Sequence, residues 1–275
     1  MAAQSNHLQR SLGAYFNTNA RFFQLGSKDM ILVLSESFIG EFYCHCQSTE
    51  SYDTKPKGNV GSLAQTPSQF LYRRDHAEIN RFITAIFSLK WLITNDYESF
   101  TSGQTGSTKL TKASFRELRE LLVKFSLSSG QIYVLCVVLL IRNLGAVSEF
   151  RCDVLSAYTN NDSEKQFSDH EVIERAAKEG YVAAVKHLPE DLKKWLLEGL
   201  KPRFRVDIEQ LAQAENAQAE KAHAENADAT HLQLQTVAPW ALEFIFVEMI
   251  LAIASSQGHV DTRGAIAFTE PICRL

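Results

Sequence analysis

The spacing of apolar residues along the chain predicts α-helices rather than strands. Between Pro67 and Pro189, where no proline occurs, apolar residues recur at intervals of three and four, the repeat of an α-helix. The clearest segment follows Asp75, which together with Glu78 forms a capping-box pattern at a helix start. Its apolar residues share one face: Ile79, Phe82, Ile83, Ile86, Leu89 and Ile93. We therefore expect an all-α fold.

Further helices are expected on both sides of this segment. One opens at Ser114, again with an acidic residue, Glu117, three positions later. The next, over 132–144, is apolar on all sides, which is typical of a central buried helix, and Gly145 fits a C-terminal cap. The remaining helices are predicted at 170–187, 189–200 and 239–255.

Other segments are less regular. Residues 30–34 fit a short strand or the start of a helix, and a polar loop is expected over 94–108. We expect a single domain, with residues 1–70 as an irregular or helical N-terminal segment and 71–275 as the helical domain. An alanine-rich pentapeptide repeat at 212–230 matches neither the helix nor the strand period. It is interpreted as an insert lengthened by replication slippage, or as a partner-binding or metal-binding tract.

Composition and charge narrow the classes of partner. The 275 residues are 45% apolar, enough for a globular core, and 28 Lys and Arg against 32 Asp and Glu give a net charge of −4. A chain without excess positive charge lacks the electrostatic footprint of a nucleic-acid-binding protein, so we expect no nucleic-acid partner.

The apolar runs of the sequence bear on the cellular location of the protein. The N-terminus has no apolar core of the kind found in a secretory signal, so a cytoplasmic protein with reduced cysteines is expected. The apolar runs at 132–141 and 239–254 are shorter or more charged than a membrane span of about 20 apolar residues. We expect no membrane partner. The final residues, 272–275, look like the start of a further apolar helix, as in a truncated chain.

Short sequence motifs indicate neither a catalytic site nor a complete metal site. The sequence contains no GxxxxGK[ST], GxGxxG, GxSxG or HExxH pattern, which removes the main support for nucleotide-loop, dinucleotide and serine-hydrolase functions. Cys44, His45 and Cys46 are zinc-ligand types, but no second ligand pair follows. We interpret this cluster as a coincidence just after a helix end.

A longer pattern resembles a known family. The run from Val137 to Phe150 resembles the signature helix of the HD-domain superfamily of metal-dependent phosphohydrolases, in which an apolar helix ends in His-Asp-apolar-Gly-Lys. An upstream histidine, here His76, and a later aspartate also belong to that pattern. Residues 168–275 further resemble an uncharacterised fungal group of HD-like proteins. The stretches that carry this second resemblance are Asp169-His170-Glu171-Val172, 211–216, 258–261 and 269–271.

This resemblance implies a set of candidate residues. The metal candidates are His76, Asp169, His170 and Asp261, with a divalent metal as the implied cofactor of an active enzyme. Three of them also have a structural interpretation: His76 as a capping or core histidine, and Asp169 as a helix cap with His170 exposed in the first turn.

This chain departs from the family pattern at the two positions, His and Asp, that bind the metal in the superfamily. Arg142 and Asn143 stand where the superfamily has His and Asp. A guanidinium cannot coordinate a cation, and an amide offers one neutral oxygen in place of a bridging carboxylate, so we expect hydrolysis to be lost and no cofactor to be bound. Arg142 could instead bind a phosphate bidentately, or could be a surface arginine favoured by the dipole of the helix.

These arguments favour a catalytically inactive HD-like helical protein that binds a phosphorylated ligand or a protein partner. Two alternatives stay open. The first is a metal-dependent phosphohydrolase that uses His76, Asp169 or His170, and Asp261. The second is a helical scaffold without a small-molecule site.

Overall fold

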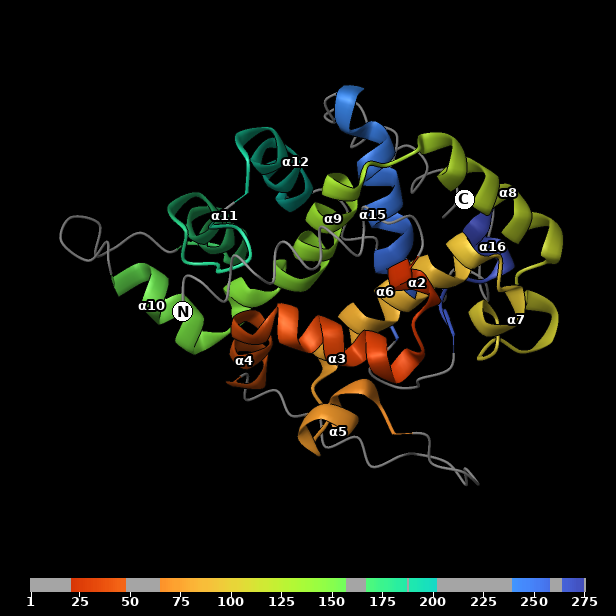
Figure 1. Cartoon of the computed structure of the whole chain (residues 1–275), viewed down its shortest axis with the longest axis horizontal. Helices are drawn as coiled ribbons and strands as arrows, with labels where there is room; N and C mark the ends of the chain where they lie inside the picture. Colours follow the sequence, from red (N-terminus) through yellow and green to blue (C-terminus); the bar gives the residue numbers. More distant parts are fainter. Residues whose placement is uncertain are drawn as a thin grey trace, which may run out of the picture. The chain divides into compact units, whose positions relative to one another are not determined.

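The regular elements of the protein are helical wherever the computed structural model describes the chain (Figure 1). The described residues are 21–47, 65–156, 167–186, 188–201, 239–257 and 264–274. They contain no strand, which confirms the predicted all-α fold. Residues 30–34, for which a strand was one alternative, lie within a helix, α3 (Ser27–Ser37). The repeat at 212–230 lies outside the described residues.

The helices form two compact units, each assembled from separate stretches of the chain. The first unit takes the described residues up to 83 and those from 127 to 201, and the second takes those of 84–126 and those after 201. Residue 70 is therefore not a boundary between the units. The long helix α6 (Ala77–Thr94) contributes its first seven residues to the first unit and the rest to the second.

The first unit is built around a buried apolar helix. Besides the start of α6, this unit contains α2 (Arg21–Gln24), α3, α4 (Ile39–Gln47), α5 (Pro67–Tyr72), α9 (Ser129–Ile141), η2 (Leu144–Ala146), α10 (Ser148–Ser156), α11 (Asp169–Glu179) and α12 (Glu190–Leu200). The buried helix is α9, whose residues from Val134 to Ile141 are all buried. It packs against α12, and the rings of Phe38 and Phe42 meet Phe82 edge-on nearby.

Local sequence explains where α9 begins. The Ser128 side chain accepts a hydrogen bond from the Gln131 backbone N–H, while the Gln131 side chain accepts one from the Ser128 N–H. This reciprocal pair satisfies two N–H groups that a helix start leaves without partners.

The stretch Ser129–Ala146 is long and apolar enough to span a membrane by length and composition alone, and 61% of it is buried within the protein. A buried core helix meets the same two criteria.

Several predicted helix ends differ from the observed ones. α9 ends at Ile141 rather than 144, and Gly145 lies in the 3-10 turn η2 instead of capping α9. Likewise, α11 ends at Glu179, because Gly180 takes a left-handed conformation there, whereas the apolar pattern continues to 187. The polar loop predicted over 94–108 contains two short helices, α7 (Tyr97–Phe100) and η1 (Gly106–Thr108).

Two predicted N-terminal caps are also wrong. The helix expected at Ser114 begins at Lys112 as α8 (Lys112–Phe125), capped by Thr111, whose hydroxyl accepts a hydrogen bond from the Ser114 N–H. α6 begins at Ala77, and Asp75 does not cap it in the predicted way. The Asp75 carboxylate instead accepts hydrogen bonds from the side chains of Thr66, Gln69 and Asn80. The helices predicted at 189–200 and 239–255 agree with the observed elements within a few residues.

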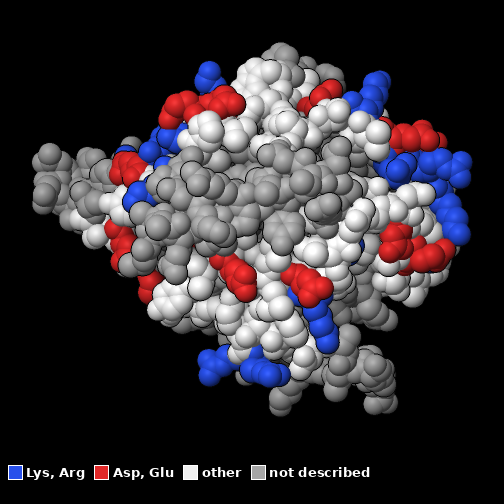
Figure 2. Space-filling model, in the orientation of Figure 1, with Lys and Arg blue, Asp and Glu red and all other residues white. Residues whose placement is uncertain are grey.

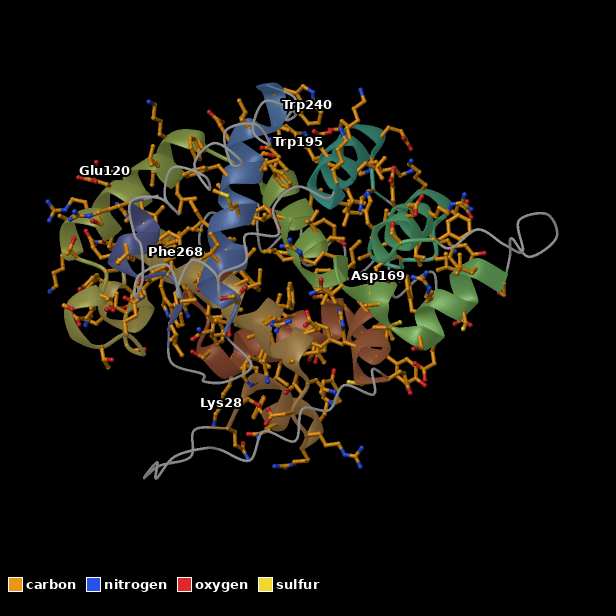
Figure 3. The ribbon with its side chains drawn as sticks, turned by 180° about the vertical axis from the view of Figure 1, so that it is seen from behind. Lys28, Glu120, Asp169, Trp195, Trp240 and Phe268 are labelled. Carbon is orange, nitrogen blue, oxygen red and sulfur yellow. The ribbon has the colours of Figure 1, made fainter. Side chains whose placement is uncertain are left out.

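The second unit encloses its own apolar core. Besides most of α6, it contains α7, η1, α8, η3 (Pro239–Ala241), α15 (Leu242–Ser255) and α16 (Glu270–Cys273). The buried core residues are Leu92, Phe100, Leu110, Phe115, Leu118, Ile250, Ala254, Ala265 and Phe268. Figure 3 labels Phe268, which comes from the segment just before α16 and meets the ring of Phe100 edge-on. The surface of α8 has both positive and negative side chains, and at the right edge of Figure 2 blue Lys and Arg side chains gather with red Asp and Glu side chains beside them.

Buried polar side chains fasten the C-terminal segment to this core. The Gln104 amide nitrogen donates to the carbonyl oxygens of Ala265 (2.6 Å) and Phe268 (2.8 Å), and its oxygen accepts from the Leu110 N–H (2.9 Å). The Glu270 carboxylate accepts from the Thr111 N–H at 2.8 Å. It also accepts from the Ser114 hydroxyl (2.7 Å) and lies 2.9 Å from the Arg274 guanidinium.

The Glu270 contacts predict a loss of stability in acid. The Thr111 N–H above all, with Ser114 and Arg274, lowers the pKa of Glu270 from 4.5 to about 2. A carboxyl with a lowered pKa stabilises the folded state above its unfolded pKa, and this contribution disappears as the pH falls from about 4.5 towards 2. We expect Glu270→Gln to lower the melting temperature at pH 7 and to lower it clearly less at pH 2.5. An equal loss at both pH values would contradict this assignment.

Candidate functional site

Three segments that carry predicted site residues adjoin at the C-terminal end of α9. The Asn143 amide nitrogen lies 2.5 Å from the Glu78 carboxylate in the first turn of α6, and it donates a hydrogen bond there. Two residues further on, Gly145 touches the backbone of Asp169 at the start of α11. The end of α9, the start of α6 and the start of α11 therefore surround one turn of the chain, residues 142–145, which we call the α9 turn.

Gly145 allows this close approach. A Cβ atom at residue 145 would lie 2.0 Å from the Asp169 carbonyl oxygen and 2.7 Å from its carbonyl carbon. Such distances are far below van der Waals contact, and both atoms belong to the backbone, so no side-chain rotation relieves them. Gly145 is therefore required because α11 packs on it.

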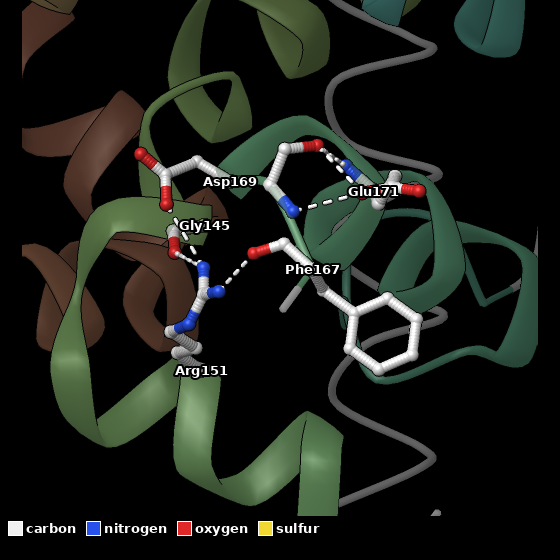
Figure 4. A network of polar contacts seen from close by, with 6 residues as sticks. Gly145, Arg151, Phe167, Asp169 and Glu171 are labelled. Atoms are coloured by element: carbon white, nitrogen blue, oxygen red, sulfur yellow. Dashed lines mark hydrogen bonds and ion pairs between the residues drawn. The ribbon is translucent and has the colours of Figure 1, made fainter. Parts of the chain in front are cut away.

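Arg151 on α10 connects the α9 turn to the start of α11 (Figure 4). One guanidinium nitrogen lies 2.9 Å from the Asp169 carboxylate and 3.4 Å from the Gly145 carbonyl oxygen. The other donates to the carbonyl oxygen of Phe167. With about a quarter of its side chain exposed, Arg151 forms a charge-assisted link between segments that α10 separates in the sequence.

Arg142 and Asn143, the two residues at the metal-dyad positions of the pattern, lie next to each other in the α9 turn. Arg142 is half-buried and follows the last residue of α9, with its backbone N–H bonded to the Val138 carbonyl oxygen at 3.1 Å. Asn143 is exposed, and its amide is engaged by Glu78, whose carboxylate also pairs with Arg81. The amide and the carboxylate thus bond directly to each other.

His76 lies immediately before α6 and is half-buried. Its backbone N–H donates to the Ser68 hydroxyl at 2.9 Å, and its ring meets the Tyr72 ring edge-on at 5.8 Å. Burial, and then the positive charge of Arg74, lowers the pKa of His76 below its usual value of 6.5. A neutral imidazole in contact with an aromatic ring fits the structural interpretation of this histidine.

Asp169 and His170 open α11 but do not form a cap. The cap is Ser168, which makes a reciprocal capping box with Glu171, so the interpretation of Asp169 as the cap is wrong. The carboxylate of Asp169, which is labelled in Figure 3, forms an ion pair with the Arg151 guanidinium. His170 is half-buried rather than exposed, with Nε2 at 3.4 Å from the Glu174 carboxylate.

The fourth metal candidate, Asp261, lies outside the described residues. Among the described part of the chain, no group of three or more His, Cys, Asp or Glu side chains could hold a metal ion. The chemistry of the individual donors agrees with this: Asp169 faces a guanidinium and Asn143 donates its amide to a carboxylate. These residues do not fit a divalent metal, and no catalytic step through a metal follows from them.

The Cys44-His45-Cys46 cluster lies inside α4 and not after a helix end. Burial raises the pKa of both thiols, that of Cys46 to about 11, so neither is a thiolate at neutral pH. His45 is only 3% exposed, and its Nε2 lies 2.7 Å from the Leu140 carbonyl oxygen. Since a carbonyl only accepts, Nε2–H is the donor, and His45 caps a carbonyl that the end of α9 leaves free.

Three residues that shape the α9 turn were not predicted in these roles: His45, Glu78 and Arg151. Glu78 looked like half of a capping box, and His45 like part of a metal cluster. Their partners are distant in the sequence, 95 residues for His45 to Leu140 and 65 for Asn143 to Glu78. Periodicity and capping patterns describe neighbours within about four residues, so they contain no signal for these contacts.

Comparison with known proteins assigns the chain to a family. No curated protein and no solved structure matches the chain significantly. A family model described as "Family of unknown function (DUF6829)" matches residues 33–275. Since this match covers most of the chain, the protein belongs to the DUF6829 family, whose function is unknown.

Proposed function

We propose that the protein is a non-catalytic HD-like helical protein that binds a phosphorylated small molecule at the α9 turn without a metal ion. One observation supports it above the others. In the described part of the chain, the carboxylate and amide at the expected metal site are bonded to other side chains, and a half-buried arginine lies in the same turn.

Arg142 supplies the chemistry for phosphate. A guanidinium is charged at any physiological pH and presents paired N–H groups that match two phosphate oxygens. Asn143 contributes less, because its amide is neutral and lies beside Glu78, a carboxylate that would repel an anion bound next to it. The proposal assigns the main contact to Arg142 on the basis of its charge, and places the phosphate on the side of the turn away from Glu78.

The test is a titration of the purified full-length protein in the presence of EDTA. Inorganic phosphate, pyrophosphate and nucleoside mono- and triphosphates are added separately, and binding is measured by calorimetry. We expect at least one of them to bind. Arg142→Gln should weaken its binding by about tenfold or more, which corresponds to the 1.5–3 kcal/mol of a hydrogen bond to a charged group. Arg116→Gln, an exposed arginine on α8, is the matched control and should bind as the wild type does.

Each other outcome contradicts the proposal. Stoichiometric metal in the purified protein together with phosphate release would support the phosphohydrolase alternative. If no phosphate compound binds, or if Arg142→Gln binds as the wild type does, the scaffold or a protein-partner function is favoured instead.

A further inference from the structure

Two titratable side chains, one helical turn apart on α4, are buried against the backbone of other segments. Glu41 is 3% exposed and accepts a hydrogen bond from the Ala184 N–H at 2.8 Å. His45, equally buried, donates to the Leu140 carbonyl oxygen at 2.7 Å. The His45 contact lies close to the α9 turn, because Leu140 precedes Arg142 by two residues.

The His45 ring satisfies only one of its two nitrogens. Nδ1 is buried and has no hydrogen-bond partner among the described residues. In the neutral ring with Nε2–H donating, Nδ1 carries only a lone pair, so the missing partner costs little. In the protonated ring Nδ1 becomes a donor, and a buried charged donor without an acceptor costs considerably more.

The surroundings do not compensate for that charge. The ionisable groups that act on the ring are Glu78 and His76 at the start of α6. Glu41, Cys44 and Cys46 lie on α4 itself, Arg142 follows Leu140 by two residues, and Asp153 on α10, which packs against α4, acts on Cys44. Burial has the largest effect and lowers the pKa of His45 below 6.5, and His76 acts in the same direction. The hydrogen bond to Leu140, which the protonated ring can also donate, and the charge of Glu78 favour protonation but do not outweigh burial. Glu78 is also already bonded to Asn143 and Arg81.

We propose that His45 is a proton-operated latch on the C-terminal end of α9. The neutral ring holds the Leu140 carbonyl and with it the α9 turn. Protonation turns the ring away, frees the carbonyl and loosens residues 140–147. The latch concerns the turn itself and does not depend on which ligand, if any, binds there.

The sign of the effect follows from linkage. In the open turn the ring is solvated and titrates near 6.5, whereas in the closed turn its pKa is lower. The closed turn is therefore favoured above pH 6.5. Below that pH the opening equilibrium grows by up to about tenfold for each pH unit, until the pKa of the closed form is reached. Protonation of Glu41 does not counteract this opening at low pH, because a protonated carboxyl still accepts the hydrogen bond from the Ala184 N–H.

Hydrogen exchange tests the latch directly. Exchange of the full-length protein is followed by mass spectrometry from pH 7.5 to 5.0 and corrected for the intrinsic effect of pH. We expect protection of residues 140–147 to fall by about tenfold or more over this range, while α8 keeps its protection. In His45→Gln the fall should disappear, because the glutamine amide nitrogen can replace Nε2 as the donor and does not titrate. His170→Gln, at a half-buried histidine on α11, is the matched control and should keep the fall.

Two results would overturn the proposal. One is an equal fall in wild type and His45→Gln, which would assign the effect to another group. The other is a loss of protection in α8 as large as in 140–147, which would mean global unfolding. If His45→Gln does not fold, the titration of the His45 ring in the wild type is followed by NMR, and a midpoint that does not coincide with the loss of protection over residues 140–147 would overturn the proposal.

Discussion

Gly145→Ala is expected to lower the free energy of unfolding by about 3 kcal/mol, the upper end of the usual cost of overpacking. The added Cβ would lie 2.0 Å from the Asp169 carbonyl oxygen, so the α9 turn and the start of α11 must separate. Separation also weakens the hydrogen bonds that Arg151 makes to both segments. For a protein of this size, the melting temperature should fall by roughly 6–12 °C.

Gly40→Ala provides the matched control. Gly40 lies in α4 of the same unit, and a Cβ there would meet nothing closer than the Ala183 Cβ at 3.9 Å, an ordinary contact. Alanine in a helix is otherwise favoured over glycine, so this variant should be neutral or more stable by up to about 1 kcal/mol. Similar melting temperatures for the two variants would show that α11 does not pack on Gly145 in solution. The candidate site would then lose one of its three segments.

Gln104→Leu should be the most damaging single change in the second unit. Leucine removes three hydrogen bonds at once and leaves the Leu110 N–H and the Phe268 carbonyl without a partner, whereas the Ala265 carbonyl keeps its bond from the Phe268 N–H. Each buried backbone group without a partner costs about 1–3 kcal/mol, so a total near 4 kcal/mol is expected. The leucine side chain is apolar and similar in size, so the loss reports on polar contacts rather than on a cavity.

The measurement combines urea unfolding with limited proteolysis. We expect a lower urea midpoint and faster cleavage within residues 264–274, because this segment loses its attachment to the loop before α8. Gln131→Leu is the control, since Gln131 accepts one hydrogen bond as part of the α9 capping box and should cost only about 1 kcal/mol. An effect of Gln104→Leu no larger than that of the control would show that the C-terminal segment is held mainly by its apolar residues.

The candidate site residues were selected by their resemblance to the HD-domain sequence pattern. Their ability to bind a ligand depends also on the side chains they contact, and the pattern does not include these. His76, Arg142, Asn143, Asp169 and His170 are all described in the first unit. Asn143 is bonded to Glu78, Asp169 to Arg151 and His170 to Glu174. An Asp169 carboxylate paired with a guanidinium differs as a ligand from a free one. This difference is the reason why we propose binding without a metal rather than metal-dependent hydrolysis.

The sequence by itself determined the helical class of the fold and the presence of its central buried helix, because the apolar period depends only on residues within a few turns of each other. The predicted range of 132–144 placed the start of this helix three residues late, since the Ser128–Gln131 capping box was not identified from the sequence. The end of α9 was decided by tertiary contacts: His45 caps Leu140, and Gly145 accommodates α11 rather than serving as a left-handed cap. Asp169 meets Arg151 across 18 residues of sequence, and His45 meets Leu140 across 95. Contacts over such separations form only when the chain has folded, because burial of the apolar faces brings the segments together.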